Sequence, residues 1–257
     1  MANNQGCKIT LYWLEQSRSQ SILWLLEELQ LEYELKTFKR RADKLAPSEL
    51  KNVHPLGKSP LITIEAPGSS EPMVLAESGA IIEYLCDHFG TNKTLIPERY
   101  VAGREGQVGG EREEWMRFRY FMHYVEGSLM PFMVMKVVND SLRNSPPFFV
   151  RPLTGFVASQ IEASFLNRNI QGNLAFLEER LKTAPEGGPF ICGKELTAAD
   201  ILLSFPIIAI SRRLLKGEEK AKYPLLAAYA ERLQTADGYK KAVAKVEQVE
   251  GTFSASM

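Results

Sequence analysis

The chain has 257 residues, enough for one large domain or two smaller ones. Lysine and arginine together number 31, as do aspartate and glutamate, so net charge favours neither a nucleic-acid partner nor an anionic membrane surface. The first residues lack the apolar core of a signal peptide and no apolar run could span a membrane, so we expect a cytoplasmic protein. Peripheral association with an organelle membrane stays open.

The cysteines and histidines exclude two further classes. Three cysteines occur without a Cys-x-x-Cys pair, which predicts reduced thiols rather than a disulfide framework. The three histidines have no metal-ligand spacing, so we expect no metal.

Strand-like and helix-like segments alternate in residues 1–92. Apolar and β-branched runs predict strands, and apolar side chains at a spacing of three or four predict helices. The expected order is a strand at 9–13, a helix at 22–30, a strand at 33–38, a short helix at 47–50, strands at 61–64 and 73–75, and a helix at 77–89. This order resembles a thioredoxin-like α/β fold, with a small mixed sheet between helices.

The remainder of the chain predicts a linker followed by an all-helical bundle. Residues 93–110 are rich in glycine and charge, as linkers are, and residues 111–257 form the second domain. Helical periodicity covers 112–138, 159–182, 196–210, 225–233 and 239–246. We expect the three prolines of residues 144–152 to interrupt the bundle.

Two local motifs stand out from this pattern. Thr197 and Asp200 have the spacing of a capping box, in which each side chain accepts from the other residue's backbone N–H at a helix start. Residues 55–60 read Pro-Leu-Gly-Lys-Ser-Pro, directly before the third strand, and Glu77-Ser78 stands at the start of the helix after the fourth. Free backbone N–H groups at such a helix start can hold a carboxylate.

Together these motifs resemble the soluble glutathione transferases. The block around residues 55–79 is similar to their glutathione-binding half, and the capping box is similar to one in their helical half. The tract 124–129, Tyr-Val-Glu-Gly-Ser-Leu, is similar to fungal members related to the first yeast enzyme of this kind. The resemblance covers nearly the whole chain, least clearly residues 140–165 and the C-terminal tail.

The resemblance implies a set of glutathione ligands. Pro60 would follow a cis peptide bond, Ser59 would pair through its backbone with the cysteinyl unit, and Glu77 and Ser78 would hold the γ-glutamyl end. The glycine carboxylate needs a cation, for which Lys58 fits best.

Lys44 is a weaker choice for the same carboxylate.

Glutathione chemistry also needs a thiolate, because thiols titrate near ~8.5 and the protonated form is a poor nucleophile. Ser17 lies between the first strand and the first helix, where a hydroxyl could donate to the sulfur, as in serine-type members. Tyr12 is the alternative, because tyrosine-type members place their hydroxyl on the first strand. Ser19 and Arg18 remain further candidates.

The second substrate would bind in the helical half. Aromatic and methionine side chains crowd residues 118–135, most of them expected in the core or a subunit interface. Among this group we expect Phe121, Tyr124 and Ser128 to line an electrophile pocket.

We therefore expect a homodimeric glutathione transferase that conjugates its co-substrate, glutathione, to hydrophobic electrophiles, with reduction of organic hydroperoxides as a second reaction. One alternative is a non-catalytic glutathione-binding or regulatory module, because fold does not settle activity. A cysteine-type thiol-disulfide reductase is disfavoured, because no cysteine lies near positions 12–19.

Overall fold

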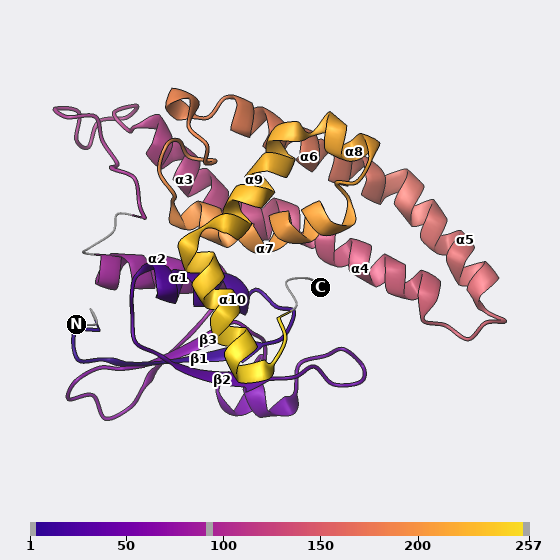
Figure 1. The fold of residues 1–257 in the computed structure, drawn as a ribbon, viewed down its shortest axis with the longest axis horizontal. Coiled ribbons are helices and arrows are strands. Elements are labelled where there is room, and N and C mark those ends of the chain that lie inside the picture. The colour runs from indigo at the N-terminus through magenta and orange to yellow at the C-terminus, as the bar shows by residue number, and fades with distance from the viewer. Residues whose placement is uncertain (1–3, 91–94, 254–257) are drawn as a thin grey trace.

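The computed structural model describes residues 4–90 and 95–253. Figure 1 shows a half built on a β-sheet and a half built of helices, with the last helix, α10 (Asp237–Glu250), lying back across the sheet half. The predicted architecture, a thioredoxin-like α/β domain followed by an all-α domain, is confirmed.

A four-stranded mixed sheet forms the first half. Its spatial order is β2-β1-β3-β4, with β2 parallel to β1 and the other two pairings antiparallel. The parallel pair needs a crossover, which helix α1 (Ser19–Glu28) supplies. The strands are β1 (Lys8–Leu14), β2 (Glu34–Phe38), β3 (Leu61–Glu65) and β4 (Met73–Ala76).

Two more helical segments complete this half. A short 3₁₀ helix, η1 (Ser48–Asn52), precedes β3, and α2 (Ser78–Phe89) follows β4 directly. The strand β1 pairs with β3 so that Tyr12 stands opposite Leu61. This register brings the end of β1 beside the start of β3, where the predicted site residues lie.

The second half consists mainly of helices. Two wide π turns, η3 (Val125–Leu129) and η4 (Glu162–Leu166), join consecutive helices without a break, and a 3₁₀ turn, η5 (Pro185–Gly187), precedes the loop before α7. The remaining helices are α3 (Glu113–Tyr124), α4 (Met130–Asn144), α5 (Arg151–Ile161), α6 (Asn167–Lys182), α7 (Ala198–Arg213), α8 (Glu218–Lys222) and α9 (Pro224–Thr235).

The prolines of residues 144–152 interrupt the bundle for fewer residues than expected. Helix α5 already begins at Arg151, with Pro152 in its first turn. Proline is tolerated there because its missing N–H would have no intrahelical partner. The helix predicted from residue 159 therefore starts eight residues earlier, and α4 and α5 form the long hairpin at the right of Figure 1.

The described part of the predicted linker, residues 95–110, contains neither helix nor strand. It runs through successive turns and closes with an isolated bridge between Tyr100 and Glu111. The boundary predicted between residues 92 and 93 lies outside the described residues.

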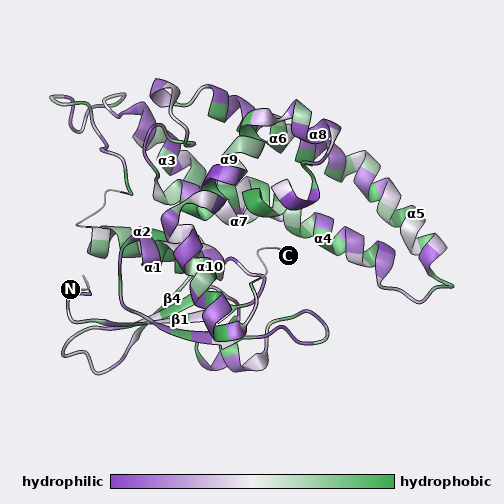
Figure 2. Ribbon diagram, viewed as in Figure 1, coloured by the Kyte–Doolittle hydropathy of each residue, from purple (hydrophilic) through white to green (hydrophobic). Residues whose placement is uncertain are grey.

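Helix α7 is the centre of the core, and nearly all of its side chains are buried. The hydropathy colouring of Figure 2 shows it as a largely apolar helix between its neighbours. The predicted capping box at its start is present: the Thr197 N–H donates to Asp200 Oδ2 at 2.8 Å. In the part of the chain that the structure describes, no helix is both long and apolar enough to cross a membrane.

One hydrophobic core runs through both halves. Helix α1 of the sheet half packs against α7 and α10 of the helical half. Polar contacts cross the same boundary: Gln20 Nε2 donates to the Tyr239 hydroxyl at 2.9 Å, and the Ser21 and Ser204 hydroxyls are 3.4 Å apart. The two halves therefore present one continuous surface on which a site can be built.

Candidate functional site

Five of the predicted glutathione ligands line one small pocket. The pocket has a volume of about 30 Å³ and lies where β3 begins, β4 ends and α2 begins. Its volume suits one small functional group. Its lining residues are Arg18, His54, Leu56, Lys58, Ser59, Pro60, Leu61, Ala76, Glu77 and Ser78.

The backbone at this pocket takes two uncommon conformations. The peptide bond between Ser59 and Pro60 is cis, as the resemblance implied. Glu77, directly before α2, has φ 71°, a region that side chains other than glycine rarely adopt. Residues other than glycine with a positive φ cluster at ligand sites.

The amino end of α2 faces this pocket. Ser78 is buried, and the first intrahelical hydrogen bond runs from the Ile81 N–H to the Glu77 carbonyl at 2.9 Å. The preceding amides therefore have no partner within the helix, and the positive end of the helix dipole lies beside them. This end of α2 is suited to a carboxylate.

Ser17 is buried on the other side of Ser59. Its hydroxyl donates to the Leu14 carbonyl oxygen at 2.7 Å and lies 3.5 Å from the Ser59 hydroxyl. Ser59 in turn donates to the Tyr12 carbonyl oxygen at 3.2 Å. The turn after β1 thus holds Ser17 against the segment that carries the cis proline.

Ser19 supports Ser17 directly. The two hydroxyl oxygens are 2.5 Å apart, and the Ser19 N–H donates to Ser17 Oγ at 3.2 Å. A hydroxyl that accepts from an N–H is a better donor to a third group, because hydrogen bonds in a chain polarise one another. Ser19, which the sequence offered only as a further candidate, is thereby a neighbour that positions Ser17.

The Tyr12 ring lies over the neighbouring strand β2. Its centroid is 6.3 Å from that of Phe38 in a stacked pair, and Lys36 Nζ lies 5.5 Å from the ring. Tyr12 does not line the small pocket. Its backbone carbonyl accepts a hydrogen bond from the hydroxyl of Ser59, which does line it.

An ion pair between the sheet half and the helical half lies beside the small pocket. Arg18 lines the small pocket, and its guanidinium donates to Glu126 Oε2, in the π turn after α3. Burial raises the pKa of Glu126, and Glu77 raises it further, whereas Arg18 and the Ser78 hydroxyl act in the opposite direction. The other oxygen, Oε1, is buried and has no hydrogen-bond partner among the described residues.

Sequence reasoning did not assign Glu126 a role. One signal was available, because Glu126 is the only acid between Phe118 and Met135 in a tract of aromatic and methionine side chains. A lone acid in such a tract must find a partner, since burying an unpaired charge is costly. That the partner would be Arg18, more than 100 residues earlier, could not be inferred from spacing.

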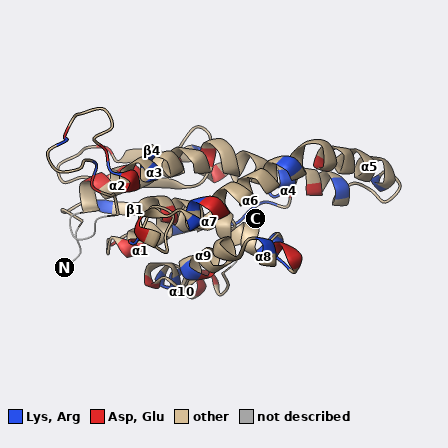
Figure 3. Cartoon of the chain, turned by 90° about the horizontal axis from the view of Figure 1, so that it is seen from above, with Lys and Arg blue, Asp and Glu red and all other residues tan. Residues whose placement is uncertain are grey.

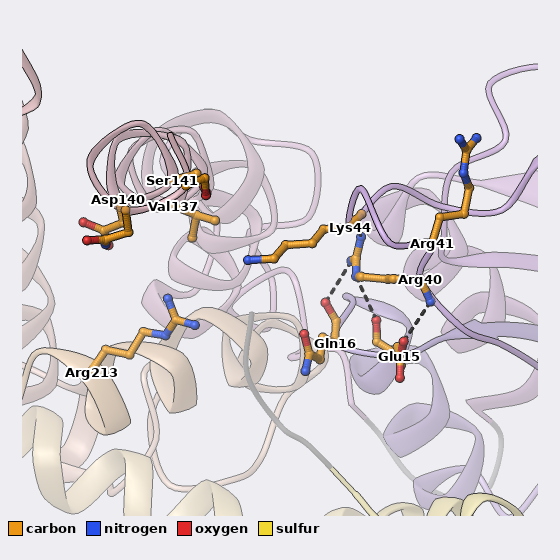
Figure 4. A pocket seen from close by; sticks show the side chains of 11 residues that line it. Glu15, Gln16, Arg40, Arg41, Lys44, Val137, Asp140, Ser141 and Arg213 are labelled. Carbon is orange, nitrogen blue, oxygen red and sulfur yellow. Dashed lines mark hydrogen bonds between the residues drawn. The ribbon is translucent and has the colours of Figure 1, made fainter. Parts of the chain in front are cut away.

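Lys44 does not join the small pocket. It lines a larger cleft of about 640 Å³ between the two halves of the molecule, together with Arg40 and Arg41 (Figure 4). The cleft extends from the turn after β1 to α4 and to Arg213 at the end of α7.

Phe121 and Tyr124 lie in the interior. Phe121 is fully buried, and the two rings pack with Tyr120 and Phe176. The Tyr124 hydroxyl donates to Asn173. Ser128 is exposed in the π turn, and none of the three predicted pocket residues lines either the small pocket or the cleft.

The cysteines are separate from this region. Burial raises the pKa of the Cys86 thiol to about 12 and also raises that of Cys192, so both stay protonated. All three cysteines are free. Within residues 4–90 and 95–253, no group of three or more His, Cys, Asp or Glu side chains could hold a metal ion.

Comparisons with known proteins agree with this geometry. Residues 8–87 match the glutathione S-transferase N-terminal domain, and residues 130–237 match the C-terminal domain. The chain is 31% identical to glutathione S-transferase 1 of Saccharomyces cerevisiae over 247 residues, covering 95% of this chain and 98% of that protein.

Solved structures give the same result. A glutathione S-transferase from Actinobacillus pleuropneumoniae is 29% identical with a TM-score of 0.66, covering 93% of each chain. A homologue from Lodderomyces elongisporus, solved with two glutathione molecules per subunit, is 20% identical with a TM-score of 0.66 and covers 91% of this chain and 97% of that one.

A thioredoxin-like half with a cis proline, joined to a helical half, defines the class of fold that these relatives share. The chain belongs to the glutathione S-transferase family.

Proposed function

We propose that the protein activates glutathione as a thiolate and transfers it to electrophilic small molecules. The observation that carries this proposal is that Ser59 and the amino end of α2 line one pocket, with the Ser17 hydroxyl 3.5 Å from that of Ser59. Nothing in the local sequence requires these three segments to lie together. A glutathione site does require it.

The proposed roles follow from the chemistry of each group. The first-turn amides of α2 and Ser78 take the γ-glutamyl carboxylate, and Glu77 faces its ammonium. Ser59 pairs with the cysteinyl backbone, and Lys58 serves the glycine carboxylate. The Ser17 hydroxyl donates to the sulfur, which stabilises the thiolate over the thiol.

For the transfer step, the protein needs to supply no further chemical group and only has to place the two reactants correctly. The thiolate attacks the electrophilic carbon, the leaving group departs with the electron pair of the broken bond, and the thiol proton has already gone to solvent. Holding both reactants beside each other supplies the rate enhancement together with stabilisation of the thiolate.

The test begins with glutathione binding to the purified chain, measured by calorimetry. Conjugation is then followed over a panel of aryl halides, with organic hydroperoxides as a second panel. Turnover above the uncatalysed rate supports the transferase proposal. Binding without turnover over both panels would favour the non-catalytic module instead, and absence of binding would exclude both.

We further propose that the protein is a cytoplasmic homodimer. Half of the exposed large apolar side chains among the described residues lie between positions 134 and 165, on the hairpin of α4 and α5 and in the π turn η4 that follows it. Figure 2 shows apolar segments recurring along both helices of this hairpin. Monomeric proteins rarely expose such a concentration, and a second copy of the chain is the occupant we propose.

A further inference from the structure

The larger cleft begins at the residue beside the proposed thiol activator. Gln16 lines the cleft, and Ser17 follows it in the same turn. On its other side, Ser17 lies 3.5 Å from Ser59 of the small pocket. A glutathione sulfur at Ser17 would therefore face the cleft, whose volume of about 640 Å³ is in the range of small-molecule sites.

The residues that line this cleft are charged or polar, apart from Val137. They include four cationic side chains, from the loop after β2 and from α7, and two acids, Glu15 and Asp140. Each acid also lies near a lysine outside the lining, and each of these lysines is shared with a second acid. Lys39 lies 3.4 Å from Glu15 and 2.5 Å from Glu250. Lys136 lies 2.5 Å from Asp140 and 3.1 Å from Glu162. The lining itself therefore keeps its excess of four cations over two acids.

Two of these cations face the cleft without an ion-pair partner among the described residues. Among the described residues, no carboxylate lies within 4.0 Å of the Lys44 ammonium or the Arg213 guanidinium. Figure 4 shows Lys44 extending from its loop toward Val137 on α4, with Arg213 approaching from the helical half. Arg41 points away and pairs with Asp43 at 2.9 Å.

Arg40 fixes the loop that carries Lys44. Its guanidinium donates to three backbone carbonyls, those of Lys44 at 2.9 Å, Gln16 at 3.0 Å and Glu15 at 3.2 Å. These bonds tie the loop after β2 to the turn after β1. The half-buried guanidinium of Arg40 thereby holds the loop that carries Lys44 at a fixed position relative to the turn that carries Ser17.

Positive charge continues beyond the cleft. An adjoining cavity of about 340 Å³ shares Arg213 and Asp140 with the cleft, and its lining adds Lys136, Arg212 and Lys216. Lys136 is paired with Asp140, whereas Arg212 and Lys216 add positive charge. The chain as a whole is neutral, and Figure 3 shows both signs of charge on both halves. The excess of cations is therefore a local property of this cleft.

Arginines at the end of α7 also offset the negative end of its dipole, which accounts for one cation at that position. It does not account for Lys44, which comes from the other half of the molecule and points toward α4. We infer that the cleft is the site of the second substrate and selects electrophiles that carry a negative charge, such as a carboxylate. This inference rests on the proposed function and names its substrate class.

The experiment compares 4-chloro-3,5-dinitrobenzoate with its methyl ester. In both, the glutathione thiolate forms a carbon–sulfur bond at the chlorinated carbon and chloride leaves, so the two differ in charge at the far end of the ring. The readout is the enzymatic kcat/KM divided by the uncatalysed rate constant, which removes the difference in intrinsic reactivity. The wild type should enhance the rate of the anion more than that of the ester.

Arg213→Ala is the deciding variant, because this side chain is exposed at a helix end. We expect the anion to lose about threefold to tenfold more than the ester, the range for one partly screened charge pair. Arg213→Lys should restore most of the preference. Raising the salt concentration from about 20 to about 300 mM should weaken the preference of the wild type for the anion. Arg168→Ala, an exposed arginine of α6 outside both cavities, is the matched control.

The KM for glutathione is measured with both electrophiles in Arg213→Ala and Lys44→Ala. In one outcome, the KM for glutathione rises equally with both electrophiles, and the rate enhancement of the anion relative to that of the ester stays unchanged. The cations then serve the glycine carboxylate of glutathione, and the inference is overturned. Turnover of both compounds with no preference in the wild type would overturn it as well. Failure to bind glutathione or to turn over either compound is a different result, which would overturn the proposed function itself.

Discussion

At the scale of single residues, the Ser17 hydroxyl donates to the Leu14 carbonyl and lies 3.5 Å from the hydroxyl of Ser59, which lines the pocket where we propose that glutathione binds. Ser19 also donates to that carbonyl, at 3.2 Å, so Leu14 keeps a donor when Ser17 turns toward a thiolate. Such a switch leaves no buried carbonyl unpaired, which would otherwise cost about 1–3 kcal/mol.

We therefore predict that Ser17→Ala raises the pKa of enzyme-bound glutathione by one unit or more, equivalent to about 1.4 kcal/mol. The measurement is a titration of thiolate ultraviolet absorbance in the presence of saturating glutathione. Tyr12→Phe is the control and should leave this pKa in place. The opposite pattern would transfer the role of thiol activator to Tyr12.

The Arg18–Glu126 pair predicts energetic coupling between the two halves. Both side chains are about one third exposed, so screening limits the interaction to about 0.5–1 kcal/mol. A double-mutant cycle with Arg18→Gln and Glu126→Gln, read by urea unfolding, should return a coupling of this size. The same cycle read by the KM for glutathione should also be non-additive, and additivity in both readouts would remove Glu126 from the site.

Glu126 also predicts a pH dependence. Its pKa is raised in the folded protein, so folding takes up a proton there, and its contribution to stability falls as pH rises from 4.5 through the folded pKa. The difference in unfolding free energy between wild type and Glu126→Gln should decrease over this acid window and level off above it. A difference that grows with pH in this window would contradict the raised pKa.

At the scale of elements, Asp200 joins three segments of the helical half. Its carboxylate accepts from the backbone N–H groups of Thr197 and Ile191, at 2.8 and 3.0 Å, and from the hydroxyls of Thr197 and Tyr229, both at 2.6 Å. The capping box was predicted from local sequence. The contacts to Ile191 and to Tyr229 of α9 required the tertiary structure.

We predict that Asp200→Asn destabilises the protein by about 2–4 kcal/mol, because an amide nitrogen replaces an acceptor among four buried donors. Chemical unfolding monitored by circular dichroism measures the change. Asp237→Asn, in the exposed first turn of α10, is the matched control and should cost less than about 1 kcal/mol. Similar losses in both variants would mean that Asp200 acts only as a helix-start charge.

Gly238 determines how closely α10 packs on α1. A Cβ atom at this position would lie 2.0 Å from Glu28 Oε2 and 2.7 Å from Trp24 Nε1. We expect Gly238→Ala to destabilise the fold by about 1–3 kcal/mol through overpacking. Gly172→Ala in α6, where a Cβ meets no atom within 4 Å, should instead stabilise by about 0.5–1 kcal/mol. Urea unfolding of both variants tests this reversal of sign.

At the scale of the whole molecule, the exposed apolar hairpin predicts the oligomeric state. Phe149 and Phe156 are 72% and 63% exposed on this hairpin. We expect the wild type to have twice the mass of one chain in light scattering and the double variant Phe149→Glu/Phe156→Glu to dissociate. Leu225→Glu on α9, 41% exposed, is the control and should stay dimeric. A monomeric wild type would exclude a homodimer, and a variant that stays dimeric would place the interface elsewhere.

The sequence by itself determined the order of strands and helices, the turn before β3, the start of α2 and the capping box of α7, whereas the cis bond before Pro60 was implied by the family resemblance. These features depend on periodicity and on contacts between residues a few positions apart, which are readable along the chain. It did not determine that Arg18 meets Glu126, that Lys44 and Arg213 face one cleft, or that Phe121 lies in the core. Those relations join residues that lie far apart along the chain or on different elements, so they arise only when the helices and loops pack together, and only the tertiary structure decided them.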